Sequence, residues 1–169
     1  LKKFGADDKS NFGRWNYYKS INHGHLVVDI EHNPAGIDNI LNLATGFKQL
    51  HKVNGLLRLM YGNTADRRDT IPEIVALINK YHVDEVIIKE FQTSLRGSQL
   101  GEMPQVFYAE LIKQGYPSEK IKIMPNEFEA TQFILTQAKP DDFTLLCSHE
   151  LIVEVSKLMR DVLANEKVK

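Results

Sequence analysis

The chain lacks the features that mark disulfide-built, membrane-spanning or polyanion-binding proteins. Its single cysteine, Cys147, excludes a disulfide framework and is typical of a reducing compartment, where we expect it to be a buried small side chain. No apolar run approaches the roughly 18 residues that a membrane-spanning helix needs, and the N-terminus has no signal-peptide core. The 21 Lys and Arg residues nearly balance the 22 Asp and Glu residues. We therefore expect a cytoplasmic protein without a membrane or nucleic-acid partner.

Several catalytic and binding motifs are also missing. Neither Gly-x-x-x-x-Gly-Lys-Ser/Thr nor Gly-x-Gly-x-x-Gly occurs, so another domain would have to hold most of the phosphates of any nucleotide. No Gly-x-Ser-x-Gly elbow follows a strand, which disfavours a hydrolase. The six histidines are scattered, and His23 with His25 lacks cysteine partners, so no metal site is expected within this chain.

What the chain does contain is a regular alternation of short β-rich runs with amphipathic stretches from about residue 25 onward. The expected strands lie near residues 25–30, 56–61, 85–89, 120–124 and 143–147. The apolar stripes that follow them are Ile37, Ile40, Leu41, Ala44 and Phe47; Ile71, Ile74, Val75, Ile78 and Tyr81; Met103, Val106, Phe107 and Leu111; Phe128, Ala130, Phe133 and Ile134; and Leu151, Val155, Leu158, Met159 and Val162. Continuously apolar strands indicate a sheet covered on both faces. We predict an α/β, Rossmann-like fold with a largely parallel sheet and helices on both sides.

The domain organisation follows from the same pattern. Residues 1–24 are expected to form an irregular or hairpin-like lead-in, whose aromatic side chains Phe12, Trp15, Tyr17 and Tyr18 dock on the sheet. Residues 25–169 are expected to form one Rossmann-like domain, because no linker or low-complexity tract interrupts them. The chain begins on leucine rather than methionine, which indicates an excised piece of a longer protein.

Charged residues gather where the expected strands end. Asp29 ends the first strand, residues 62–69 (Gly-Asn-Thr-Ala-Asp-Arg-Arg-Asp) follow the second, and Ser-His-Glu at 148–150 follows the fifth. Ligands of open parallel sheets bind at this edge. The tandem Arg67 and Arg68 offer planar guanidinium groups that fit a phosphate or a carboxylate. Helix caps, solvated loops and surface ion pairs remain the alternatives for each residue.

Three stretches resemble the C-terminal domain of the Mur ligase superfamily. Residues 11–16 (Asn-Phe-Gly-Arg-Trp-Asn) resemble the glycine-arginine-aromatic motif that opens this domain. Residues 27–36 (Val-Val-Asp-Ile-Glu-His-Asn-Pro-Ala-Gly) resemble its strand ending Asp-Tyr-Ala-His-Asn-Pro. Residues 66–69, 84–90, 95–97 and 101–102 together are similar to the Mur-ligase-like half of cyanophycin synthetase.

The resemblance implies an ATP-dependent enzyme that joins an acid to an amino acid. In the superfamily, a central domain of the same polypeptide carries the phosphate loop and the magnesium ligands, and the C-terminal domain closes on it with the amino acid. ATP phosphorylates a carboxylate, and the amino group then attacks the acyl phosphate. ATP and Mg²⁺ are thus the implied cofactors, an amino acid and a polypeptide acceptor are the implied partners, and the isolated chain is expected to be inactive.

The resemblance also implies roles on the nucleotide side. Arg14 matches the arginine that reaches the terminal phosphate of ATP, where it can stabilise the charge that develops on transfer. Asp29 matches the acid that contacts the nucleoside, and His32 and Asn33 lie beside it at the nucleotide edge.

For the incoming amino acid, the position of the strand ends points to a separate set of side chains: Arg67, Arg68, Glu90, Arg96 and Glu102. Cyanophycin synthetase adds arginine to the β-carboxylate of aspartate with its Mur-like half. That likeness implies that Glu90 or Glu102 faces the guanidinium of the substrate, whereas Arg96 or Arg68 faces a carboxylate or phosphate.

Two departures from the pattern leave alternatives open. Ile30 and Glu31 stand where tyrosine and alanine are usual, and Asn-Thr-Ala at 63–65 stands where Pro-Gly is usual, which indicates altered substrate choice or lost activity. One alternative is another Mur-type ligase, of the folylpolyglutamate or peptidoglycan-precursor type. The other is a non-catalytic α/β domain that binds a nucleotide or a partner protein. The oligomeric state, a homo-oligomer included, also stays open.

Overall fold

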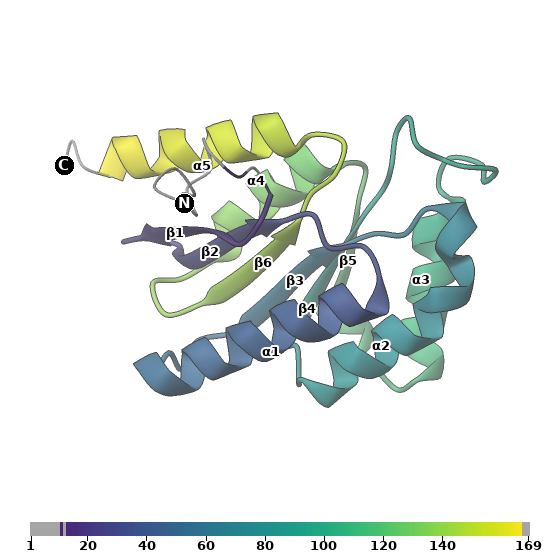
Figure 1. The fold of residues 1–169 in the computed structure, drawn as a ribbon, viewed down its shortest axis with the longest axis horizontal. Coiled ribbons are helices and arrows are strands. Elements are labelled where there is room, and N and C mark those ends of the chain that lie inside the picture. The colour runs from purple at the N-terminus through teal and green to yellow at the C-terminus, as the bar shows by residue number, and fades with distance from the viewer. Residues whose placement is uncertain (1–10, 12, 167–169) are drawn as a thin grey trace.

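A six-stranded sheet forms the centre of the molecule, in the order β1-β2-β6-β3-β4-β5 (Figure 1). The computed structural model describes residue 11 and residues 13–166. The strands are β1 (Asn16–Ser20), β2 (Gly24–Asp29), β3 (Leu57–Tyr61), β4 (Glu85–Lys89), β5 (Ile121–Met124) and β6 (Phe143–Cys147). The helices are α1 (Pro34–His51), α2 (Ile71–Lys80), α3 (Glu102–Lys113), α4 (Glu127–Gln137) and α5 (Ile152–Glu166), with 3-10 turns η1 (Ala65–Thr70) and η2 (Ser118–Lys120). All strand pairs except β1 with β2 are parallel, so the predicted α/β fold is confirmed.

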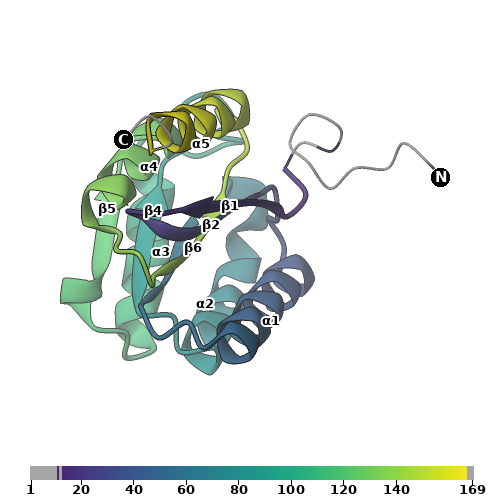
Figure 2. The ribbon, with the colours of Figure 1, turned by 90° about the vertical axis from the view of Figure 1, so that its left-hand side faces the viewer.

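Helices cover both faces of this sheet (Figure 2). Successive residues of a strand point to opposite faces, so neighbours such as Val27 and Val28 enter different cores. Val27 and Leu145 pack in the core under α1, α2 and α3, whereas Val28 and Leu146 pack in the core under α4 and α5. Because both faces are buried, the central strands are apolar along their whole length, as the sequence pattern predicts.

The helices begin and end on recognisable signals. The Asn33 side chain accepts a hydrogen bond from the amide of Gly36 at 3.0 Å and caps α1, which then opens on Pro34. Lys52, in the left-handed conformation, ends the same helix. In α4 the predicted stripe is partly wrong: Phe128 is only half-buried, and the buried positions are Glu127, Ala130, Thr131 and Ile134. Two polar residues are buried there because both make hydrogen bonds inside the fold.

The lead-in contributes a strand of its own. Residues 16–20 pair antiparallel with β2 and so form the edge strand of the sheet. Before this strand the chain turns at Gly13, whose φ is +64° and where a Cβ would lie 2.4 Å from Ile30 Cγ2 and 2.5 Å from Ile152 Cδ1. Glycine adopts this turn without strain, whereas a Cβ here would have to displace the side chains of Ile30 and Ile152. Tyr18 is buried as expected, Tyr17 is 40% exposed, and Phe12 lies outside the described residues.

A buried ion pair lies at the amino ends of the strands, at the edge of the sheet opposite their carboxyl ends. The Arg58 guanidinium is 3% exposed and pairs with Asp142 and Glu85. Asp142 also accepts the backbone amides of Leu56 and Lys139, both at 2.8 Å. No helix in the described part of the chain is long and apolar enough to cross a membrane.

Candidate functional site

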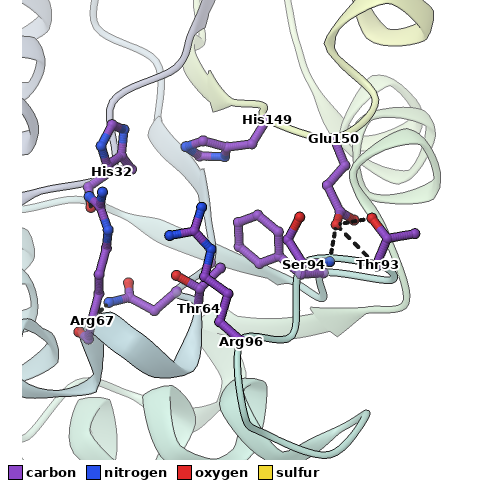
Figure 3. A pocket seen from close by; sticks show the side chains of 11 residues that line it. His32, Thr64, Arg67, Thr93, Ser94, Arg96, His149 and Glu150 are labelled. Carbon is purple, nitrogen blue, oxygen red and sulfur yellow. Dashed lines mark hydrogen bonds between the residues drawn. The ribbon is translucent and has the colours of Figure 1, made fainter.

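A cavity of about 410 Å³ opens at the carboxyl edge of the sheet (Figure 3). It is lined by His32, Gly62, Asn63, Thr64, Arg67, Phe91, Thr93, Ser94, Arg96, His149 and Glu150. Each of these residues follows the end of β2, β3, β4 or β6. The cavity therefore lies at the edge where open parallel sheets bind ligands, as the charged strand ends predict.

The ends of β3 and β4 come unusually close beside the cavity. A Cβ on Gly62 would lie 2.3 Å from the carbonyl oxygen of Lys89, far inside van der Waals contact. Glycine at this position lets the loop after β3 approach the loop after β4 and so shapes the cavity.

Two arginines bring positive charge to the cavity. Arg67 Nη1 donates to the carbonyl oxygen of His32 at 3.0 Å, and Arg96 Nη1 pairs with Asp66 at 2.7 Å. Figure 3 shows both side chains reaching towards the side of the cavity where His32 and His149 lie. Guanidinium groups in such a place bind a carboxylate or a phosphate through paired hydrogen bonds.

Glu150 is the one carboxylate among the lining residues, and it organises the opposite wall. It accepts the backbone amides of Gln92, Thr93 and Ser94 at 2.7, 3.0 and 2.6 Å, and the Thr93 hydroxyl at 2.6 Å. Partial burial alone would raise the pKa of Glu150, but these hydrogen bonds lower it to about 2. The group is therefore ionised and holds the loop after β4 against the loop after β6.

Behind this wall lies a buried cluster of Lys89, Glu127 and His149. The side chains of Lys89 and Glu127 are 0% and 1% exposed and form an ion pair. Lys89 Nζ also lies 2.9 Å from His149 Nδ1 and 3.7 Å from the centre of the Phe91 ring. Burial and the neighbouring ammonium lower the pKa of His149, although Glu127 opposes them. His149 is thus neutral, and because an ammonium only donates, Nδ1 accepts and the ring hydrogen is on Nε2.

The residues expected at the nucleotide edge lie at the end of β2. Asp29 is 4% exposed and accepts the amides of Trp15 at 2.7 Å and Glu31 at 3.1 Å, while its burial raises its pKa. The Arg14 guanidinium is half exposed and lies 3.7 Å from the Glu31 carboxylate. His32 alone of the expected nucleotide-edge residues lines the cavity, and its ring lies 5.9 Å from that of His149.

The residues expected to bind the amino acid separate into two groups. Arg67 and Arg96 line the cavity, whereas Arg68, Glu90 and Glu102 do not. Arg68 and Glu102 form an exposed ion pair at 3.1 Å. Glu90 is 6% exposed and accepts the amide of Gly101 at 2.6 Å, and burial raises its pKa.

Sequence reasoning missed Glu127 and did not select His149 or Glu150 as site residues. Glu127 directly follows the helix-capping Asn126, so from sequence it resembles an ordinary acid in a first helical turn. The Ser-His-Glu at 148–150 gave a signal, since polar residues follow a buried strand there. Among the described residues, no three His, Cys, Asp or Glu side chains gather into a metal-binding group.

Comparisons with known proteins identify the family to which this fold belongs. A family model described as "Mur ligase, glutamate ligase domain" matches residues 13–149. The UDP-N-acetylmuramoyl-L-alanyl-D-glutamate–2,6-diaminopimelate ligase of Blochmanniella floridana is 27% identical over 135 residues, which cover 79% of this chain and 25% of that protein.

Solved structures show the same fold. E. coli FolC in complex with ADP matches with a TM-score of 0.64 and 16% identity over 88% of this chain and 31% of its own. A murein peptide ligase from Psychrobacter arcticus matches with a TM-score of 0.60 and 18% identity over 89% of this chain and 30% of its own. The chain thus spans between a quarter and a third of the length of these relatives. It belongs to the Mur ligase family and corresponds to the domain that the family model describes as the glutamate ligase domain.

Proposed function

We propose that the chain is the C-terminal domain of an ATP-dependent ligase that joins an amino acid to an acceptor carboxylate, and that the cavity at the carboxyl edge of the sheet receives the amino acid. A central domain of the same polypeptide would hold most of the ATP and the divalent metal. The relatives support this division. E. coli FolC was solved with ADP, and a Yersinia pestis folylpolyglutamate synthase/dihydrofolate synthase with AMPPNP and Mn, and the chain covers 31% of each.

The observation that carries the proposal is the charge arrangement of the cavity. Arg67 and Arg96 present guanidinium groups, and the ionised Glu150 carboxylate, whose oxygens accept four donors from residues 92–94, adds negative charge across from them. An amino acid carries one group of each sign, so its α-carboxylate fits the arginines. Its amino group can then be directed at an acyl phosphate formed on the central domain, and the cavity contributes by positioning rather than by covalent chemistry.

The nucleotide side belongs to the same proposal. Within the described part of the chain, the Arg14 guanidinium has one long contact, with Glu31, and the side chain is half exposed, so it can turn towards a phosphate bound by the other domain. Asp29 accepts backbone amides from Trp15 and Glu31 on different oxygens, and a carboxylate in this position can also accept a hydrogen bond from a ribose hydroxyl. His32 and Asn33, which follow the same strand, complete this edge.

The finer proposal is that the incoming amino acid is arginine. Its support is the likeness of residues 66–69, 84–90 and 95–97 to the Mur-ligase-like half of cyanophycin synthetase. An acid must then meet the guanidinium of the substrate, and Glu90 and Glu102 stay the candidates, because Glu150 already accepts four donors from residues 92–94. The relatives instead carry the names of diaminopimelate and folylpolyglutamate enzymes.

A panel of amino acids tests the choice of substrate. The longer parent protein is supplied with ATP, an aspartate-arginine polymer primer and one amino acid at a time, and phosphate release is measured. Release that requires arginine supports the finer proposal. Release with diaminopimelate or glutamate, in the presence of the acceptor that suits each, would instead assign the domain to the type of its relatives.

The location of the amino-acid site is tested by comparing two arginines. Arg96→Ala in the parent protein should raise KM for the amino acid about tenfold with little change in kcat, the effect of losing one charge-assisted hydrogen bond. Arg68→Ala removes an equally exposed guanidinium outside the cavity and should leave KM near the wild-type value. A rise in KM with Arg68→Ala alone would move the site to the exposed pair with Glu102.

A further inference from the structure

A buried carboxylate lies directly behind the cavity wall without lining the cavity. The Glu127 side chain, at the first position of α4, is 1% exposed. Its Oε1 atom accepts from the ammonium of Lys89 and from the amides of His149 at 2.7 Å and Glu150 at 3.1 Å. Its Oε2 atom accepts from the Ser148 hydroxyl at 2.5 Å and from the amide of Leu151 at 2.8 Å. These donors use the full accepting capacity of a carboxylate, so Glu127 is available neither to substrate nor to proton transfer.

Four of these donors come from one short segment, residues 148–151, between β6 and α5. The backbone N–H groups that lead into a helix have no partner within the helix and need an external acceptor. Glu127 provides that acceptor for three of them. The path of the segment is therefore determined by a side chain from α4, on the face of the sheet that carries α5.

The effect of this anchor extends to a second loop. Glu150, part of the anchored segment, accepts three amides and a hydroxyl from residues 92–94. Thr93 and Ser94 line the cavity, as do His149 and Glu150. One buried carboxylate thus holds the first loop directly and the second through Glu150.

We propose that Glu127 is a positioning residue for the amino-acid site: it fixes residues 148–151, and through Glu150 residues 92–94, and so sets the affinity of the cavity for the incoming amino acid. The statement about affinity rests on the proposed function, whereas the statement about the two loops does not. Lys89 completes the arrangement, because it supplies the positive charge that lets a carboxylate stay ionised in the interior.

The kinetic test is Glu127→Gln in the parent protein. Glutamine has the same shape, but its amide nitrogen replaces one acceptor and faces donors, and Lys89 loses its counter-charge. We expect KM for the amino acid to rise about tenfold, as for the loss of one charge-assisted hydrogen bond in the site, while kcat and KM for ATP change about twofold or less.

Asp142→Asn is the matched control. Asp142 is also a buried carboxylate that pairs with a cation, Arg58, and accepts backbone amides, but it lies at the opposite edge of the sheet. It should lower the stability of the domain without changing KM for the amino acid. Unchanged KM in Glu127→Gln, or an equal rise in Asp142→Asn, would overturn the proposal. Glu127→Asp, which keeps the charge but has a shorter reach to the segment, replaces Glu127→Gln where the latter does not fold.

Amide hydrogen exchange on the same variants tests the anchor without any turnover. In Glu127→Gln, the amides of residues 149–151 and 92–94 should exchange at least about fivefold faster, since local opening becomes easier. In Asp142→Asn they should not. Unchanged exchange would overturn the positioning role. A third outcome is faster exchange in Glu127→Gln together with a wild-type parent protein that uses no amino acid. That outcome would retain the anchoring role of Glu127 and refute the ligase proposal.

Discussion

Removal of the buried ammonium of Lys89 should destabilise the domain strongly. The side chain is 0% exposed, pairs with Glu127, lies 2.9 Å from His149 Nδ1 and packs on the Phe91 ring. Lys89→Met keeps most of the apolar stem in place and removes only the charge. Glu127 then remains as a buried carboxylate without a cation.

The size of the effect follows from what remains around Glu127. Removal of one partner of a buried ion pair generally costs about 3–5 kcal/mol. Glu127 keeps its hydroxyl donor and its three backbone donors, so we expect the lower end of that range, about 3 kcal/mol at pH 7. For a domain of this size, such a loss lowers Tm by about 6–12 °C.

The loss should also depend on pH. Burial alone would raise the pKa of Glu127, but hydrogen bonds from His149 and the ion pair with Lys89 hold it well below its usual range. Because the folded pKa is the lower one, ionisation of Glu127 stabilises the fold above about pH 4.5, and this contribution is lost as pH falls towards the folded value. Lys89→Met raises the folded pKa. The difference between variant and wild type should therefore stay constant near neutral pH and shrink only once the pH falls below the folded pKa of the variant.

Urea unfolding of both proteins at pH 7 and at pH 4 measures this prediction. The control is Lys80→Met, which breaks an exposed ion pair with Asp38. The side chain of Lys80 is 58% exposed and that of Asp38 is 41% exposed. That variant should unfold at nearly the same urea concentration as the wild type, because exposed ion pairs contribute little to stability. A Lys89→Met protein within about 1 kcal/mol of wild type at pH 7, or a loss of stability that grows as the pH falls from 7 to 4, would refute the reasoning.

Two further predictions concern backbone fit and histidine titration. Gly62→Ala places a Cβ 2.3 Å from the Lys89 carbonyl oxygen and should lower the free energy of unfolding in urea by about 1–3 kcal/mol. Gly46→Ala, with open space around it in α1, should raise that free energy by about 1 kcal/mol. Equal effects of the two substitutions would contradict this. Burial lowers the pKa of His25 and of His149 below that of the unfolded chain, so the unfolded state binds protons first and stability should fall as pH drops from about 7 to 5. Stability that stays level or rises over this interval would contradict the lowered pKa of both rings.

Strand positions were largely predictable from the sequence. The expected runs 85–89 and 143–147 coincide with β4 and β6, and the other parallel strands begin or end within one residue of their expected bounds. These strands are apolar because both faces of the sheet are covered, and polar residues mark where each ends. The edge where the charged strand ends meet follows from the same reasoning, and the cavity lies there.

The composition of the site was only partly predictable. Arg67 and Arg68 are adjacent, yet of the two only Arg67 lines the cavity, because neighbouring side chains of a turn point in different directions. The buried cluster behind the cavity is spread along the chain, since Glu127 lies 38 residues and His149 60 residues after Lys89. These three residues meet only through the sheet topology. No local sequence pattern indicates such a contact. The buried Glu127 in α4 lies outside the apolar stripe that the sequence indicates for this helix, Phe128, Ala130, Phe133 and Ile134.

The central claim is that the domain brings an amino acid to an ATP-dependent ligation. The most direct test is phosphate release from ATP by the longer parent protein, with an acceptor and with or without amino acids, for the wild type and for Arg67→Ala/Arg96→Ala. We expect release that requires an amino acid in the wild type, and a strongly raised KM for the amino acid in the double variant. A folded parent protein that releases no phosphate with any amino acid, or a double variant with unchanged KM, would contradict it.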